Sequence, residues 1–121
     1  MSTPVGLHIR ARDWRSALQI SEFTLYRWMR EGLIPRSQVV NAKYTYWDED
    51  TVRQWWHEQT GRDDCLPLCM LRSDVLARTG FSEPELMAAI RNDGFPRPVY
   101  VCSVERWVAG DVNAWVAANI K

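Results

Sequence analysis

The sequence has few of the features that mark membrane-spanning, secreted or catalytic chains. No stretch approaches the roughly 18 consecutive apolar residues of a membrane span, and the first 15 residues lack the apolar core of a signal peptide. The two histidines, His8 and His57, have no catalytic partners in their sequence surroundings, and no glycine-rich loop is present to hold a phosphate. We therefore expect a cytoplasmic protein that is not an enzyme, contacts no membrane and needs no cofactor.

Cysteine is also scarce. Cys65, Cys69 and Cys102 are odd in number and have no C-x-x-C spacing, which is typical of a reducing compartment rather than of a disulfide framework. A zinc site built from the three thiols and a histidine is one interpretation, but ordinary apolar or surface cysteines fit the spacing better. The sequence therefore predicts no bound metal.

Net charge is absent as well, since 15 Lys and Arg residues balance 15 Asp and Glu residues. The balance differs between the halves of the chain. Residues 1–62 carry nine basic and seven acidic side chains, whereas residues 63–121 carry six and eight. The first half is therefore the better candidate for binding an anionic partner.

A repeat is the strongest positive feature of the sequence. Residues 21–36, SEFTLYRWMREGLIPR, are matched by SEPELMAAIRNDGFPR at residues 82–97, an offset of 61. Each copy is followed by two tryptophans eight residues apart, Trp47 with Trp55 and Trp107 with Trp115. Similarity at a fixed period indicates one small module used twice. We predict two tandem domains, residues 1–62 and residues 63–121.

Each copy is expected to begin with two short helices. Apolar residues spaced three and four apart predict the first helices within 8–19 and 73–79, where Ser73 is expected to cap the latter. The second helices begin at Ser21 and at Ser82, because serine is a preferred N-cap residue, and they end before glycine. Two helices joined in this way form a helix-turn-helix.

The rest of each copy predicts a β-hairpin and a closing helix. The hairpins are expected within 36–47 and 97–107, the closing helices at 48–59 and 111–120, and a polar linker at 60–67. We therefore predict a mainly α fold with small β-hairpin wings, in two tandem winged helix-turn-helix units. The paired tryptophans are expected in the core, whereas Trp56, which follows Trp55 directly, is expected to be partly exposed and is a candidate interface residue.

This element order, together with the TLYR core of the first copy, FPRPV at 95–99 and WVAGDVNAW at 107–115, resembles the MerR-like winged-helix class. Within that class it is similar to the excisionase and AlpA-like prophage-regulator proteins. The resemblance implies that the second helix lies in the major groove of double-stranded DNA while the wing reaches a minor groove or phosphates. Thr24, Tyr26 and Arg27 stand in the family's pattern, whereas the second copy has other residues there.

The candidate DNA-binding residues lie mostly on the first copy. A helical wheel centred on Leu25 places Arg27 and Arg30 together on the opposite face, and arginine is the commonest reader of guanine. The alternative is that both arginines form solvated helix surface. The predicted contacts are Ser21, Phe23, Thr24, Tyr26, Arg27 and Arg30 on the helix, Arg36, Ser37, Asn41 and Lys43 on the wing, and Arg91, Arg97 and Arg106 in the second copy.

The function predicted from these features is sequence-specific DNA binding in a mobile element. The chain would act as a transcriptional regulator or as an excisionase, a recombination directionality factor that directs an integrase. The second copy would bind an adjacent half-site, a neighbouring copy of the chain or another protein. Two alternatives stay open: a winged-helix adaptor that binds only protein, and a DNA-packaging protein similar to a terminase small subunit.

Overall fold

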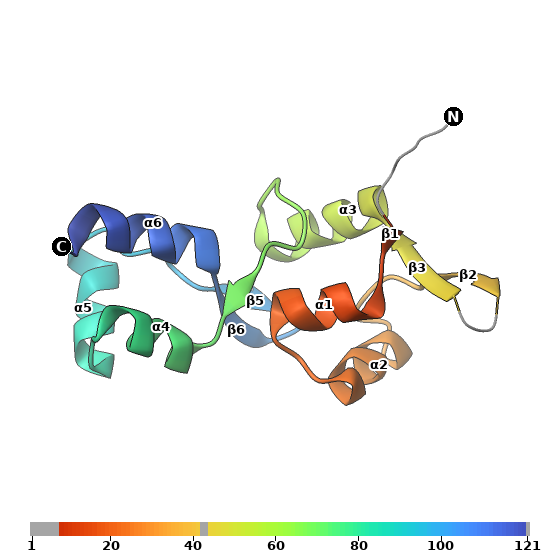
Figure 1. Cartoon of the computed structure of the whole chain (residues 1–121), viewed down its shortest axis with the longest axis horizontal. Coiled ribbons are helices and arrows are strands. Elements are labelled where there is room, and N and C mark those ends of the chain that lie inside the picture. The colour runs from red at the N-terminus through yellow and green to blue at the C-terminus, as the bar shows by residue number, and fades with distance from the viewer. Residues whose placement is uncertain (1–7, 42–43, 121) are drawn as a thin grey trace. The chain divides into compact units, whose positions relative to one another are not determined.

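The structure is a computed structural model that describes residues 8–41 and 44–120. The chain divides into two compact units, Met1–Leu66 and Pro67–Lys121, called the first and the second unit below. Each unit has its own helices and strands (Figure 1). The two domains drawn from the sequence, with their boundary after residue 62, stay a prediction.

The described residues of the first unit form three helices and a small antiparallel sheet. The central strand, β3, pairs with β1 on one side and with β2 on the other, and Ile9 lies opposite Trp47. Strands β2 and β3 form the wing, which projects from the helical part of the unit (Figure 1). The elements are β1 (His8–Ile9), α1 (Ala11–Leu18), α2 (Glu22–Arg30), β2 (Gln38–Asn41), β3 (Tyr44–Asp48) and α3 (Glu49–Thr60).

The second unit has the same element order and the same strand order, β4-β6-β5. Its wing, formed by β5 and β6, turns through Cys102 and Ser103, both with positive φ, as a two-residue turn of type I′ requires. The predicted fold class, mainly α with small β-hairpin wings, is confirmed, whereas duplication of one module stays an inference. The elements are β4 (Cys69–Met70), α4 (Arg72–Thr79), α5 (Glu83–Asn92), β5 (Val99–Val101), β6 (Val104–Val108) and α6 (Ala109–Asn119).

The beginning of each unit differs from the prediction. The first helix does not include residues 8 and 9, because His8 pairs with Asp48 and Ile9 with Trp47 as a short third strand. Helix α4 is not capped by Ser73. Its N-cap is Leu71, whose N–H donates to a carboxylate oxygen of Asp74 over 3.1 Å. Strands of two residues are too short to produce a readable period, so the sequence did not predict them.

Both second helices begin where the sequence places them. The Oγ of Ser21 accepts the N–H of Thr24 over 3.1 Å. The Oγ of Ser82 accepts the N–H of Glu85 over 3.3 Å, and the Glu85 carboxylate accepts the Ser82 N–H over 2.7 Å, completing a capping box. This backbone hydrogen bond lowers the pKa of Glu85. The two serine caps are confirmed.

The repeated tryptophans hold the loop that follows each second helix. Trp47 and Trp55 are buried, and their indole N–H groups donate to the carbonyl oxygens of Pro35, over 2.7 Å, and Leu33, over 2.9 Å. Strand β3 and helix α3 are therefore both hydrogen-bonded to the loop between α2 and the wing. Such bonds are needed because a buried indole N–H without an acceptor is costly.

The second unit repeats this arrangement. Trp107 donates to the carbonyl oxygen of Pro96 and Trp115 to that of Asp93, each over 3.0 Å. Trp107 is buried, as predicted, whereas Trp115 is only half-buried and packs against the core. In each unit the two tryptophans thus hold the loop between the second helix and the wing through their indole hydrogen bonds.

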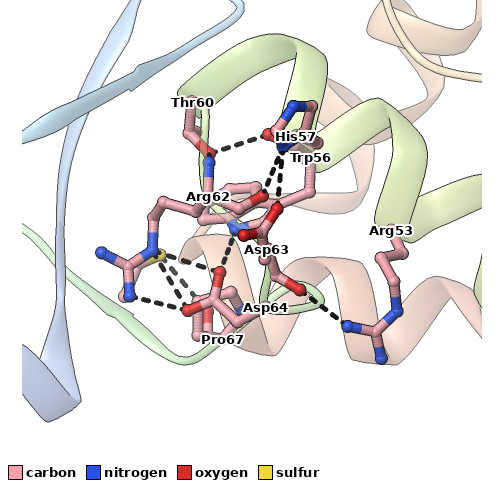
Figure 2. Close-up of polar contacts among 9 residues, drawn as sticks. Arg53, Trp56, His57, Thr60, Arg62, Asp63, Asp64 and Pro67 are labelled. Atoms are coloured by element: carbon pink, nitrogen blue, oxygen red, sulfur yellow. Dashed lines mark hydrogen bonds and ion pairs between the residues drawn. The ribbon is translucent and has the colours of Figure 1, made fainter.

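Trp56 is not exposed, contrary to the prediction, and has 0% of its surface accessible. Its indole N–H donates to a carboxylate oxygen of Asp64 over 2.6 Å, and Arg62 pairs with the same carboxylate at 2.7 Å (Figure 2). Arg53 also donates to the carbonyl oxygen of Asp63 over 2.8 Å. The expected linker therefore folds back toward the end of α3 and contacts Trp56, whereas Trp55 packs against Trp14.

Candidate nucleic-acid interface

Helix α2 has one buried and one exposed stripe. Leu25 and Trp28 are buried against the core of the first unit. The exposed stripe, which we call the α2 stripe, has the spacing i, i+3, i+4, i+7 of a single helix face. Its members are Phe23 (70% exposed), Tyr26 (45% exposed), Arg27 and Arg30.

The α2 stripe combines two aromatic rings, Phe23 and Tyr26, with two guanidinium groups, Arg27 and Arg30. Each guanidinium can donate two parallel hydrogen bonds to a planar acceptor pair. Arg27 and Arg30 also lie in the last turn of α2, where a positive charge interacts favourably with the negative end of the helix dipole. The stripe can therefore offer both apolar contact and bidentate donors to one ligand.

Ser21 and Thr24 lie at the beginning of α2. The Ser21 hydroxyl accepts the backbone N–H of Thr24, and the two side-chain oxygens are 3.1 Å apart. Their visible role is to start the helix, and thereby to set the direction in which the α2 stripe faces. A direct contact of either residue with DNA stays a prediction.

The wing residues are described only in part. Arg36 is exposed and Ser37 is half-buried, just after Pro35, whose carbonyl is held by Trp47. The backbone of Asn41 ends β2 but its side chain is not described, and Lys43 lies outside the described residues. Of the four predicted wing contacts, the structure thus places Arg36 and Ser37 at the base of the wing.

The equivalent stripe of α5 is less basic. At an offset of 61, Pro84 and Ala88 stand in place of Phe23 and Arg27. Met87, 40% exposed, replaces Tyr26, and Arg91 keeps the last arginine. The structure therefore leaves one exposed guanidinium on the face that carries two in the first unit.

A cluster that sequence reasoning did not find lies beside this face. The guanidinium of Arg72 donates to both carboxylate oxygens of Glu105, over 3.0 and 2.8 Å, and to Glu83 over 2.7 Å. It also lies 5.4 Å from the centre of the Trp107 ring. These hydrogen bonds raise the pKa of Arg72 above its ordinary value. The three charged residues are far apart in the sequence, so no local pattern could have revealed the cluster.

A groove of about 230 Å³ lies between α5 and the second wing. Arg97 is exposed at this groove, as a basic contact residue should be. Arg106, another predicted contact, is half-buried: its guanidinium donates to the carbonyl oxygen of Glu105 over 2.6 Å, and burial lowers its pKa. The other groove residues are Arg72, Met87, Ile90, Pro98, Tyr100, Glu105 and Trp107.

The described part of the chain contains no cluster of three His, Cys, Asp or Glu side chains suited to a metal ion. Within the same residues, no helix combines the length and the apolar character needed to cross a membrane. Cys69 is buried, and burial raises the pKa of Cys102 to about 11, so that this thiol stays protonated at neutral pH.

The first unit resembles a known protein family. A family model described as prophage CP4-57 regulatory protein (AlpA) matches residues 8–60, which run from β1 to the end of α3 and include the α2 stripe and the first wing. No curated protein and no solved structure matches the chain. The match supports the AlpA-like resemblance, whereas the MerR-like class stays a prediction. The first unit of this chain is similar to the AlpA family of prophage regulatory proteins.

Proposed function

We propose that the chain binds double-stranded DNA at specific sequences, with α2 as its recognition helix. The α2 stripe carries this proposal: two arginines and two aromatic residues are exposed on a helix whose opposite face is buried. In helix-turn-helix proteins the second helix enters the major groove and its exposed side chains reach the base edges. The match of residues 8–60 to the AlpA model is in keeping with this role.

Arg27 and Arg30 would supply the sequence preference. A guanidinium contacts the O6 and N7 atoms of guanine through two hydrogen bonds, and each good pair discriminates by roughly 1–3 kcal/mol. Arg36, Ser37, Asn41 and Lys43 would contact phosphates, which sets the register of the protein on the duplex but carries no sequence information.

The biological role that we propose is transcriptional regulation in a phage or an integrative element, as the name of the matched family model suggests. An excisionase role is the second possibility. An excisionase would bind beside an integrase site and bend the DNA there, and integrase would then be its protein partner. Footprints at a promoter support the first role, whereas footprints within an attachment site, with integrase bound cooperatively, support the second.

The second unit would contribute less to DNA affinity. Its α5 face retains Arg91, whereas Arg72 is engaged with Glu83 and Glu105 through its guanidinium nitrogens. We propose a weak contact with an adjacent half-site, since linking two modules raises the effective concentration of the second. The groove beside α5, with Met87 and Tyr100 among its lining residues, favours protein docking as the alternative for this unit.

The decisive experiment replaces Arg27 and Arg30 by alanine, one at a time. We expect each variant to bind the preferred site roughly tenfold to a hundredfold more weakly, with a smaller loss on random DNA. Arg78→Ala is the matched control, because it removes an exposed charge that contacts Asn113 on the second unit. Wild-type affinity and salt dependence in both variants would show that α2 is not the recognition helix.

A further inference from the structure

Phe23 is the most exposed of the large apolar side chains that the structure describes, at 70%. It lies in the first turn of α2, one helical turn before Arg27. The exposed residues of a recognition helix contact base edges, and those of its N-terminal part are among them. A ring in this position leaves on the order of 100 Å² of apolar surface in water unless a ligand covers it.

The major groove offers one apolar group to such a ring. Among the four base pairs, only those with thymine carry a methyl group, at C5, and phenylalanine is one of the side chains that contact it. Charged or polar side chains gain little from that methyl group, whereas burial of one methyl group against an aromatic ring excludes water from both.

We propose that Phe23 recognises a thymine methyl group and so requires thymine at one position of the DNA site. The inference rests on the proposed function, because it takes α2 as the recognition helix. Phe23 and Arg27 are four residues apart, about 6 Å along the helix axis, and base pairs are about 3.4 Å apart. The thymine therefore lies within about two base pairs of the guanine that Arg27 contacts.

A protein interface is the competing explanation for the same surface. Aromatic residues and arginine are enriched at interfaces between proteins, and the α2 stripe holds both. The two explanations differ in one respect that can be measured: only the DNA contact depends on a methyl group of thymine.

The test uses the full chain and a preferred site selected from random duplexes. Each thymine of that site is replaced in turn by deoxyuridine, which removes the methyl group and leaves base pairing unchanged. We expect one replacement to weaken wild-type binding about fourfold, the value that corresponds to one buried methyl group. Phe23→Ala should bind the unmodified site at least that much more weakly and should be insensitive to the same replacement.

Two further variants make the result specific. Phe23→Leu keeps an apolar contact and should retain part of the dependence on the methyl group. Met87→Ala removes an exposed apolar side chain from α5 and should depend on the thymine methyl group as much as wild type does. Circular dichroism checks that each variant is folded, which we expect because Phe23 and Met87 are exposed.

The outcomes separate this inference from the proposed function. A site without thymine, or equal sensitivity to deoxyuridine in wild type and Phe23→Ala, overturns the role of Phe23 while the Arg27 result stands. A Phe23→Ala variant that binds DNA like wild type but changes the oligomeric state in ultracentrifugation assigns the residue to a protein interface. A wild-type chain without sequence preference overturns both proposals.

Discussion

At the scale of single residues, the tryptophans differ in what their indole N–H groups contact. The N–H groups of Trp47, Trp55, Trp107 and Trp115 each donate to a backbone carbonyl oxygen. Trp14 is fully buried between Trp47 and Trp55, with ring centres 5.4 and 5.0 Å away, and its N–H finds no acceptor among the described residues. Its ring contributes packing, whereas the N–H costs desolvation energy.

This difference leads to a prediction about stability. Trp14→Phe removes an N–H group that has no acceptor among the residues that the structure describes. The desolvation penalty of that group disappears, and this offsets part of the stability that is lost with the smaller side chain. Trp47→Phe removes a donor and leaves the Pro35 carbonyl without this indole N–H. We expect Trp47→Phe to lower the free energy of unfolding by at least about 1 kcal/mol more than Trp14→Phe. Urea unfolding of the two variants measures the difference, and equal values would contradict this account.

Asp64 is the second residue whose contacts give a measurable expectation. Its hydrogen bonds with Arg62 lower the pKa of the carboxyl group, and it also accepts the Trp56 N–H. A carboxyl group whose pKa is lower in the folded state stabilises the fold above its unfolded pKa. This contribution is lost as the pH falls through the folded pKa.

Asp64→Asn should therefore be less stable than wild type at pH 7. Because the Asp64 side chain is 37% exposed, we expect a loss of less than about 1 kcal/mol. The difference should shrink as the pH falls below about 4, where this carboxyl group begins to be protonated in the unfolded chain, and further as the pH approaches its lowered pKa in the folded chain. Urea unfolding at about pH 7 and about pH 2.5 tests both statements; a gap that widened in acid would mean that the charge of Asp64 does not stabilise the fold.

At the scale of elements, the helix ends depend on backbone conformation. Gly32 and Gly94 follow α2 and α5 with φ of +74° and +73°, which side-chain-bearing residues rarely adopt. Beyond the chain neighbours, no atom of the described residues lies within 4 Å of the position that a Cβ would take at either glycine. Any cost of substitution there comes from the backbone alone. Gly110, inside α6, has the same open space without a positive φ.

Gly94→Ala and Gly110→Ala should therefore have opposite effects. We expect the free energy of unfolding to fall by about 1 kcal/mol in Gly94→Ala, because a left-handed alanine is strained. In Gly110→Ala it should rise by about 0.5 kcal/mol, because alanine favours the helix. Thermal unfolding, with the wild-type chain as reference, compares the two. A loss of stability in both variants would show that steric contact rather than φ decides.

Secondary structure was predictable where the role of a residue depends only on its neighbours in the sequence. Ser21 and Ser82 were expected as caps because a hydroxyl satisfies a free backbone N–H, and both are caps. The burial of Trp56 was not predictable, because helix periodicity places it beside Trp55 and says nothing of the loop that covers it. Ser73 is not a cap because Leu71, with Asp74, begins that helix two residues earlier.

At the scale of the whole molecule, the two units have the same element order but differ in the exposed face of the second helix. The α2 stripe holds two arginines, whereas its counterpart on α5 holds Arg91 alone beside Ala88. Of the acids at the beginning of α5, Glu83 pairs with Arg72, whereas Glu85 accepts the Ser82 N–H and keeps its charge. Shared topology therefore does not imply shared ligands.

A comparison of equivalent arginines tests this asymmetry. Arg91→Ala should weaken DNA binding by less than Arg27→Ala, measured by fluorescence anisotropy on the preferred site. The physical reason is that Arg91 is the one basic residue of α5, which also carries Glu83 and Glu85, and these acids repel phosphates. The reverse ranking would mean that the second unit is the main DNA reader, and a tie would mean that both units contribute equally.

Local sequence was enough to predict the fold class, the serine caps of α2 and α5, the glycines that follow these helices, the hairpins and the exposed face of α2. Each of these follows from the conformational or hydrogen-bonding needs of residues close together in the chain. Three features could be seen only in the tertiary structure. They are the third strand of each sheet, the burial of Trp56 beside residues 61–64, and the pairing of Arg72 with Glu83 and Glu105. These features depend on a two-residue strand, on an irregular loop or on partners distant in sequence, and none of these produces a local period.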